Sequence, residues 1–340
     1  MTMPAKPRIA LLAAPQTTPS VLFGLYDVLA SVGAGYADMT GRPVGKTLLD
    51  VQIVAASAEP FRCFGNILIE PHAAIGSLDN ADAVVVCDMY TPIDTAPRGR
   101  YAAEIDWLRR LHAQGALIGS VCSGSLVLAE AGLLDGRACA GHWAYRDLFR
   151  RQYPKVNYAV NSILRLDSEA EGVITAGGVT AWQELALRLI SRYCGPEQAL
   201  QTAKVYLLSG HDDGQLPFAD RALLIQGDDK AIQLGQEWVA RHYAEANPVE
   251  AMAQIAGLAR RTFTRRFRAA TGYLPMDYVH VLRIDAAKRI IEREAAGLDE
   301  VAYKVGYEDP TFFRRLFKRE VGLTPAAYRR KFSSLLTLPA

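Results

Sequence analysis

The sequence has no apolar run approaching the roughly 18 residues that a membrane-spanning helix needs, so we expect no membrane partner. Its five cysteines are odd in number and contain no Cys-x-x-Cys pair, which argues against a disulfide framework or a zinc site. We therefore expect a cytoplasmic protein with no metal and no cofactor. The amino terminus, MTMPAKPRIALLAAP, has the outline of a secretory signal, but its apolar run is short and we interpret it as a first buried strand.

An excess of charge of one sign is also lacking in the whole chain, which carries 38 Lys and Arg against 36 Asp and Glu. The balance hides an asymmetry. Residues 247–332 hold 17 Lys and Arg and 10 Asp and Glu, a net charge of +7, and the rest of the chain has a net charge of −5. The carboxyl-terminal part is therefore the part suited to lie near a polyanion.

What is present in residues 8–195 is an alternation of short apolar runs and amphipathic stretches. We interpret five runs as strands: IALLAAP, LLDVQIVAAS, ADAVVVCD, ALIGSVC and GVITAGG. Helical spacing of apolar residues lies between them, at Pro19–Val32, Arg98–Gln114, Ser123–Ala131 and Thr180–Tyr193. This order predicts an α/β doubly wound, flavodoxin-like domain, whose ligands bind at the carboxyl ends of the strands.

Beyond Gly195 the pattern is helical only. Pro196–Leu208 and Asp229–Tyr243 have helical spacing, and Asn247 before Pro248 is a natural helix start, in which Asn can act as the cap. At 340 residues the chain is too long for one ordinary core. We expect one domain at residues 1–210, a helical linker at 211–246 and an all-α domain at 247–334.

The all-α domain contains an internal repeat. The same residue types recur 50 residues later at five positions: Phe263, Phe267, Gly272, Pro275 and Tyr278 match Phe313, Phe317, Gly322, Pro325 and Tyr328. In each copy a Gly turn precedes a helix with one aromatic face and one cationic face. The cationic faces carry Arg261, Thr264, Arg265 and Arg268 in the first copy, and Thr311, Arg314, Arg315 and Lys318 in the second. We interpret the copies as two helix-turn-helix motifs whose second helices enter the major groove.

A single basic helix is often only a solvated face, but two copies favour double-stranded DNA as the partner. Residues 249–332 resemble the DNA-binding domain of the AraC/XylS family of transcription regulators, through RTFTRRFRAATGYLP and through VAYKVGYEDPTFFRRLFKREVGLTPAAYRRKF. The resemblance implies one long helix between the motifs, at about Pro275 to Glu294. It also implies base contacts from Arg261, Thr264 and Arg265, and from Thr311, Phe312 and Arg315. Phe312 has two readings, contact with a thymine methyl or packing inside the domain.

In the first domain a strand breaks into a helix at Cys122, within GSVCSGSLVLAEAG. Strand, sharp turn and helix form a nucleophile-elbow arrangement, and the start of the helix would favour a thiolate there. His142, in GHW, is the candidate base. These residues alone allow a catalytic cysteine.

Residues 8–195 resemble the class I glutamine-amidotransferase-like fold, in the branch of the PfpI intracellular proteases, through VCSGSLVLAEAGLLDG, GHW and TAGGVTAWQELALRLI. Enzymes of that branch carry an acidic residue soon after the first strand, whereas this chain has no Asp or Glu before Asp27 there. After the strand ADAVVV, where the enzymes usually have Gly-Gly, it has Cys87 and Asp88. These departures favour a domain without catalytic activity.

The two resemblances together match the GlxA-type regulators. This implies that the first domain senses a small metabolite and forms a homodimer. We expect the effector to be lined by Asp88, Tyr90, Cys122, Ser123, His142 and Trp143, although His142 and Trp143 could equally be packed core residues. Asp88 and Trp143 suit a cationic group. The expected function is that of a sequence-specific transcription activator, which would also contact RNA polymerase.

Two alternatives remain open at this point. One is a cysteine-dependent amidase or protease that uses Cys122 and His142. The other is an architectural DNA-binding protein without sequence preference, in which the first domain only clamps a dimer.

Overall fold

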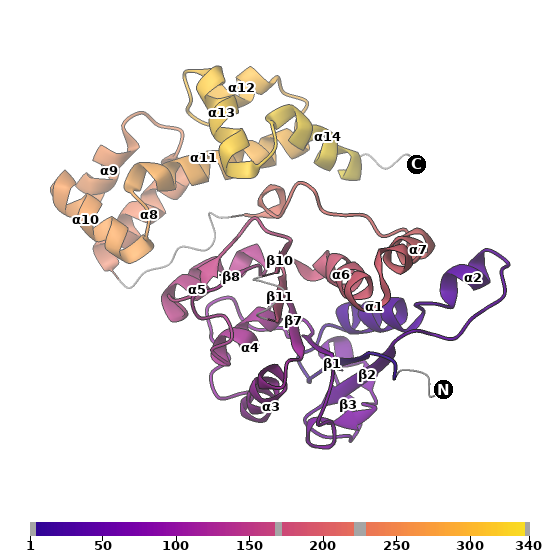
Figure 1. Cartoon of the computed structure of the whole chain (residues 1–340). Helices are drawn as coiled ribbons and strands as arrows, with labels where there is room; N and C mark the ends of the chain where they lie inside the picture. The colour runs from indigo at the N-terminus through magenta and orange to yellow at the C-terminus, as the bar shows by residue number, and fades with distance from the viewer. Residues whose placement is uncertain (1–4, 167–171, 221–228, 337–340) are drawn as a thin grey trace. The chain divides into compact units, whose positions relative to one another are not determined.

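The computed structural model describes residues 5–166, 172–220 and 229–336. The chain divides into two compact units, unit 1 at Met1–Gln215 and unit 2 at Leu216–Ala340 (Figure 1). Part of the predicted linker, residues 221–228, lies outside the described residues.

Unit 1 is built on a seven-stranded sheet of order β10-β11-β7-β6-β1-β2-β5. Within it only the β10–β11 pairing is antiparallel among the described strands. The strands of the sheet are β1 Arg8–Leu12, β2 Asp50–Ala55, β5 Ala73–Ala74, β6 Ala83–Val86, β7 Leu117–Val121, β10 Leu164–Leu166 and β11 Val173–Ala176. The predicted doubly wound α/β fold is therefore confirmed.

Helices cover both faces of this sheet (Figure 1). They are α1 Pro19–Ala30, α3 Ala102–Ala113, α4 Gly124–Glu130, α5 Arg146–Gln152, α6 Trp182–Cys194 and α7 Pro196–Tyr206. The short helix α2 Gly35–Met39 has no buried residue and contacts α7 instead of the sheet. In β1, Ile9 and Leu11 pack in one core with α1 and α6, whereas Ala10 and Leu12 pack in the other with α3 and α4. Because both faces are buried, the central strands are continuous apolar runs.

Several short elements of unit 1 were not predicted. They are the hairpin of β3 Phe61–Arg62 and β4 Leu68–Ile69, the pair of β8 Ala138–Cys139 and β9 Asn157–Tyr158, strands β5 and β10, and helices α2 and α5. Strands of two or three residues are too short to show a periodic pattern, so the sequence carries no signal for most of them.

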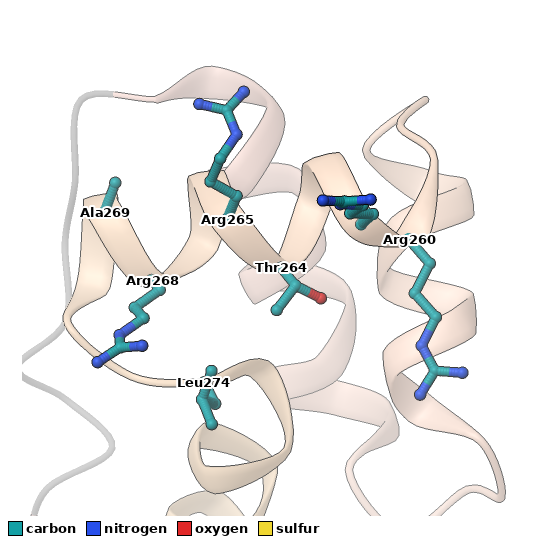
Figure 2. A pocket seen from close by; sticks show the side chains of 7 residues that line it. Arg260, Thr264, Arg265, Arg268, Ala269 and Leu274 are labelled. Atoms are coloured by element: carbon teal, nitrogen blue, oxygen red, sulfur yellow. The ribbon is translucent and has the colours of Figure 1, made fainter.

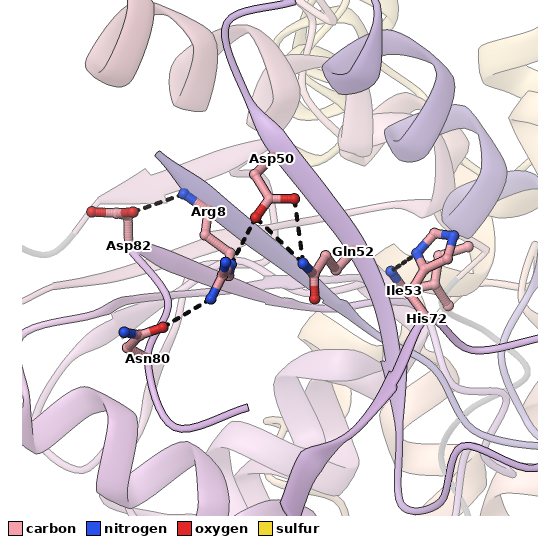
Figure 3. A network of polar contacts seen from close by, with 7 residues as sticks. All are labelled: Arg8, Asp50, Gln52, Ile53, His72, Asn80 and Asp82. Carbon is pink, nitrogen blue, oxygen red and sulfur yellow. Dashed lines mark hydrogen bonds and ion pairs between the residues drawn. The ribbon is translucent and has the colours of Figure 1, made fainter. Parts of the chain in front are cut away.

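A polar network fixes the amino ends of three central strands (Figure 3). The backbone N–H of Arg8 donates to Asp82 Oδ2 at 2.7 Å, and its guanidinium donates to Asp50 Oδ2 at 2.8 Å and to Asn80 Oδ1 at 2.9 Å. Asp50 begins β2, and Asp82 directly precedes β6. The network therefore lies at the edge of the sheet opposite to the carboxyl ends, where Cys122 follows β7.

The described part of unit 2 contains no strand. Its helices are α8 Lys230–His242, α9 Pro248–Ile255, α10 Arg260–Thr271, α11 Pro275–Arg293, α12 Leu298–Lys304, α13 Pro310–Val321 and α14 Pro325–Leu336. α9 starts where it was predicted, but Asn247 has a left-handed φ of 50° and its side chain makes no cap bond. The expected Asn cap is therefore wrong, and Pro248 in the first turn is the remaining start signal.

Helix α11 supplies residues to two separate cores. Its first half contributes Tyr278, Val279 and Leu282 to the core that contains Phe263 and Phe267 of α10. Its second half contributes Ile284, Ala286, Ala287 and Ile291 to the core that contains Phe313 and Phe317 of α13. One helix therefore ties the two halves of the repeat together.

Among the described residues, no helix is both long enough and apolar enough to cross a membrane.

Candidate functional site

The backbone at Cys122 has the strained form expected of a nucleophile elbow. Cys122 has a φ of 54°, in the left-handed region that non-Gly residues rarely adopt. Its N–H donates to the carbonyl of Ala176 at 2.9 Å, and α4 begins two residues later, at Gly124. A Cβ at Gly124 would lie 2.5 Å from the carbonyl oxygen of Val86, so only glycine fits there.

The surroundings of Cys122 oppose a thiolate. The side chain is buried, and this burial raises the pKa of the thiol well above its ordinary value. The negative charge of Asp88 and a hydrogen bond to it raise the pKa further. The expectation that the start of α4 would favour a thiolate is therefore wrong, because burial and a neighbouring carboxylate outweigh a helix of only 7 residues.

Asp88 occupies the place after β6 where related enzymes expose backbone N–H groups. Its carboxylate is buried and fully engaged: Oδ1 accepts from the Ser123 hydroxyl at 2.5 Å and from the Ser123 N–H at 3.2 Å, and Oδ2 accepts from the Thr18 hydroxyl at 2.5 Å. The N–H of Met89 donates to the Ser123 hydroxyl oxygen at 2.9 Å. Asp88, Ser123 and Cys122 are therefore brought together, with the Asp88 charge turned inward.

His142 is not arranged as a base for Cys122. Its Nδ1 accepts from the backbone N–H of Ala144 at 3.2 Å, and its ring lies 5.1 Å from the Trp143 ring. Burial lowers the pKa of its imidazole. The Nδ1 atom of His142 therefore accepts from the backbone of its own turn.

Tyr90 lies apart from the buried residues of this edge. Its side chain is 56% exposed and stacks on Phe64 of the β3–β4 segment at 5.5 Å. Three further apolar side chains close to these rings in the sequence, Ile67, Leu68 and Ile93, are also exposed.

Sequence reasoning missed Gln215, which lies beside His142 and Trp143. Its buried amide donates to the carbonyls of Gly141 and Ser162, both at 2.9 Å, and accepts from the Trp143 N–H at 3.2 Å. A Cβ on Gly177 would come within 2.2 Å of the Gln215 amide nitrogen. In a loop rich in polar residues, nothing in the sequence distinguishes this buried Gln from a solvated one.

The same loop is fixed at a second point. The ring of His211 meets Glu184 Oε1 through Nδ1 at 2.6 Å and the Thr180 hydroxyl through Nε2 at 3.1 Å. The backbone N–H of His211 also donates to Glu184 at 2.9 Å. Gln215 and His211 together hold the last segment of unit 1 over the carboxyl ends of its strands.

In unit 2, α10 buries Phe263 and Phe267 completely and exposes Arg261, Arg265 and Arg268. With Thr264 they line an open hollow of about 950 Å³, whose remaining lining is Arg260, Ala269 and Leu274 (Figure 2). Arg260 is paired with Glu250 at 2.5 Å. The predicted residues of the first motif therefore lie together on one surface.

Helix α13 repeats this arrangement. Phe313 and Phe317 are buried, whereas Thr311, Arg315 and Lys318 are exposed. Arg314 is paired with Asp299 of α12, and Phe312 is half-buried. The second motif therefore also presents its predicted cations, one of them within an ion pair.

Two family models match this sequence. The DJ-1/PfpI family matches residues 8–192, and a helix-turn-helix domain matches residues 252–331. The chain is 27% identical over 281 residues to the HTH-type transcriptional regulator CdhR of Pseudomonas aeruginosa, which covers 82% of this chain and 80% of that protein. It is 29% identical over 258 residues to the HTH-type transcriptional regulator GlxA of Rhizobium meliloti, which covers 75% of this chain and 77% of that protein.

Among solved structures, the fold resembles an AraC family transcriptional regulator from Pseudomonas putida. The sequence identity is 18%, the match covers 59% of this chain and 99% of that one, and the TM-score is 0.48.

Proposed function

The chain belongs to the DJ-1/PfpI family and carries an AraC-type helix-turn-helix region, and from this premise we propose that it is a sequence-specific, DNA-binding transcription regulator. The observation that carries the proposal is the pair of helices α10 and α13. Each buries two phenylalanines and exposes cations on the opposite side, and both are packed on α11. Relatives that cover most of this chain are named as HTH-type transcriptional regulators.

The dimensions of α11 suit simultaneous use of both motifs. A helix of 19 residues is about 28 Å long, close to the roughly 34 Å that separates successive major-groove faces on one side of a duplex. We assign base contacts to Arg261, Thr264, Arg265, Thr311 and Arg315. The remaining cations, Arg268, Arg314 and Lys318, would meet phosphates.

Unit 1 is proposed to have no enzymatic activity. A nucleophilic cysteine needs a thiolate and a base, but the Cys122 thiol has a raised pKa and His142 uses Nδ1 to accept from the backbone. The N–H groups of Met89 and Ser123 already donate to Ser123 and Asp88. These observations argue against the amidase or protease alternative.

We propose that unit 1 binds a small-molecule effector at the carboxyl ends of its strands, around Cys122, Ser123, His142 and Trp143. Ligands of doubly wound sheets bind at this edge. Asp88 and Tyr90 would contribute less directly, because the carboxylate of Asp88 is engaged by Ser123 and Thr18 and Tyr90 stacks on Phe64. Gln215 holds the end of unit 1 beside this edge, so a ligand that displaced it would alter the segment leading into unit 2.

We further propose that the protein forms a homodimer. The exposed, stacked rings of Phe64 and Tyr90 are apolar groups of the kind that a homodimer interface covers, which supports this assembly. We also propose that the protein activates transcription through RNA polymerase. It would act in the cytoplasm, where the operator is accessible.

DNA binding is tested with the purified full chain and an operator selected from random-sequence DNA. Arg265→Ala and Arg315→Ala should each weaken operator binding by about 1–3 kcal/mol and relax base preference at one position. Raising salt from 50 to 200 mM should lower affinity by about two to three orders of magnitude. Arg289→Ala, at an exposed position of α11, is the matched control. A specificity ratio near one against random DNA would favour the architectural alternative instead.

A further inference from the structure

The second helices of the two helix-turn-helix motifs, α10 and α13, carry an arginine at the same position of the repeat. These are Arg265 in α10 and Arg315 in α13. Both side chains are exposed. The residue three positions earlier differs: it is Thr262 in the first helix and Phe312 in the second. Side chains three apart on a helix are neighbours, so the two arginines have different supports.

Arg315 is seated on an aromatic ring. Its guanidinium carbon lies 5.6 Å from the centre of the Phe312 ring, within the range of a cation–π contact. Arg265 has no such ring among the described residues, and Figure 2 shows its guanidinium extending away from α10. Thr262 is too short to offer an equivalent surface.

The Phe312 ring is itself held in place. It lies 5.9 Å from the ring of His280 on α11 and 5.9 Å from the ring of Tyr307. His280 Nδ1 and the Tyr307 hydroxyl share a hydrogen bond at 3.0 Å, and the guanidinium of Arg283 lies 5.2 Å from the centre of the Tyr307 ring. Phe312 is therefore part of a fixed cluster that reaches the central helix.

A supported arginine is a better reader of bases than a free one. Ordering a long, mobile side chain on binding costs free energy, and less of that cost remains if the side chain is already oriented. The planar guanidinium matches O6 and N7 of guanine with two hydrogen bonds, and this match depends on its orientation. The benefit applies to Arg315 and not to Arg265.

We propose that Arg315, oriented by Phe312, is the main base-discriminating arginine of this chain and reads a guanine in the half-site of the α13 motif. Phe312 is then a positioning residue, and it contacts neither base nor phosphate. This inference rests on the proposed DNA-binding function. It predicts an asymmetric operator, with a strict guanine in one half-site and a more tolerant position where Arg265 reads the other.

The test compares base discrimination in the full chain. Operators are selected from random-sequence DNA with the wild type, and affinities are measured for every single-base variant of the selected sequence at fixed salt. The variants are Phe312→Leu, Phe312→Tyr, Arg315→Lys and, as the matched control in the first motif, Arg265→Lys. Binding to random DNA and the melting temperature are recorded for each variant.

Phe312→Leu should reduce the preference for guanine at one position by roughly two- to fivefold, while binding to random DNA stays unchanged. Phe312→Tyr, which keeps a ring, should retain the preference. Arg315→Lys should reduce the preference at the same position by about tenfold or more, and Arg265→Lys should have a smaller effect in the other half-site. In an Arg315→Lys background, Phe312→Leu should have no further effect on base preference.

Different outcomes separate the inference from its premise. If Phe312→Leu lowers the affinity for all sequences equally, or changes only the melting temperature, Phe312 is a packing residue and the inference is wrong. If Arg265→Lys and Arg315→Lys lose equal discrimination, the proposed asymmetry is wrong, and this comparison holds even where Phe312→Leu does not fold. If no operator is selected from random DNA by the wild type, the proposed function fails first.

Discussion

The Asp88 carboxylate helps to raise the pKa of the Cys122 thiol, and it accepts hydrogen bonds from Ser123 and Thr18. The strained turn at Cys122 is thus kept, but the chemistry that such a turn usually serves is suppressed. A raised pKa means that the thiol stays protonated, and therefore weakly nucleophilic, well above neutral pH. At the residue scale, burial first and the Asp88 charge second keep this elbow unreactive.

Replacing that charge should expose latent thiol reactivity. Asp88→Asn keeps the shape and an oxygen that can accept from Ser123 but removes the negative charge, so the pKa of Cys122 should fall. Alkylation of Cys122 by iodoacetamide, followed by mass spectrometry between pH 7 and 10, should then begin at a lower pH than in the wild type. Cys194, which is half-buried, serves as the internal reference. An unchanged profile would show that burial alone sets the pKa.

At the scale of secondary-structure elements, Arg283 fastens α11 to two turns. Its buried guanidinium donates to the carbonyls of Tyr243, Glu245 and Gly306 at 2.6, 3.0 and 2.7 Å. Gly306 belongs to the turn before α13, and the other two carbonyls follow α8. One buried side chain therefore joins α11 to the turn before α13 and to the segment after α8.

Removing this side chain should destabilise unit 2. Arg283→Met leaves three carbonyls without their donor, and we expect a loss of about 3–5 kcal/mol in the free energy of unfolding. Urea unfolding followed by the far-UV circular dichroism of the helices measures it. Arg289→Met, at an exposed position on the same helix, should change stability by less than about 0.5 kcal/mol. Equal effects of the two variants would contradict this account of Arg283.

Replacing Gln215 should likewise lower stability, because this side chain holds the loop that ends unit 1. Gln215→Leu fills a similar volume but leaves the Gly141 and Ser162 carbonyls and the Trp143 N–H unpaired in a buried site. The free energy of unfolding should fall by about 3 kcal/mol or more. Denaturant titration measures the loss, and Gln114→Leu, at an exposed loop position, is the control. A neutral result would mean that water replaces the amide.

At the scale of the whole molecule, the sequence predicted the layout better than the contacts. The five continuous apolar runs and the repeat of Phe, Gly and Pro led to the central strands and to both helix-turn-helix motifs, because burial imposes these patterns directly. The sequence predicted neither the direction in which the pKa of Cys122 is shifted nor the role of Gln215. Both depend on which side chains from distant segments meet, and a single sequence carries no periodic signal for that.

An effector should reveal itself through the stability of the full chain. A compound that binds unit 1 and not the unfolded state raises the melting temperature, and at a hundred times its dissociation constant it adds about 2.7 kcal/mol. We expect such a compound in a thermal-shift screen of a metabolite library. Trp143→Ala should abolish the shift, whereas Trp238→Ala in unit 2 should not. A shift that survives in Trp143→Ala places the ligand elsewhere.

The shared helix α11 restricts how this protein can change over evolutionary time. Each residue inserted into an α-helix turns everything beyond it by about 100° and advances it by 1.5 Å. A single-codon insertion near Arg283 would therefore rotate the second helix-turn-helix motif away from the side of the duplex that the first motif contacts. New binding preferences must then arise by substitution on the reading surfaces, because the spacing between them cannot be adjusted in small steps.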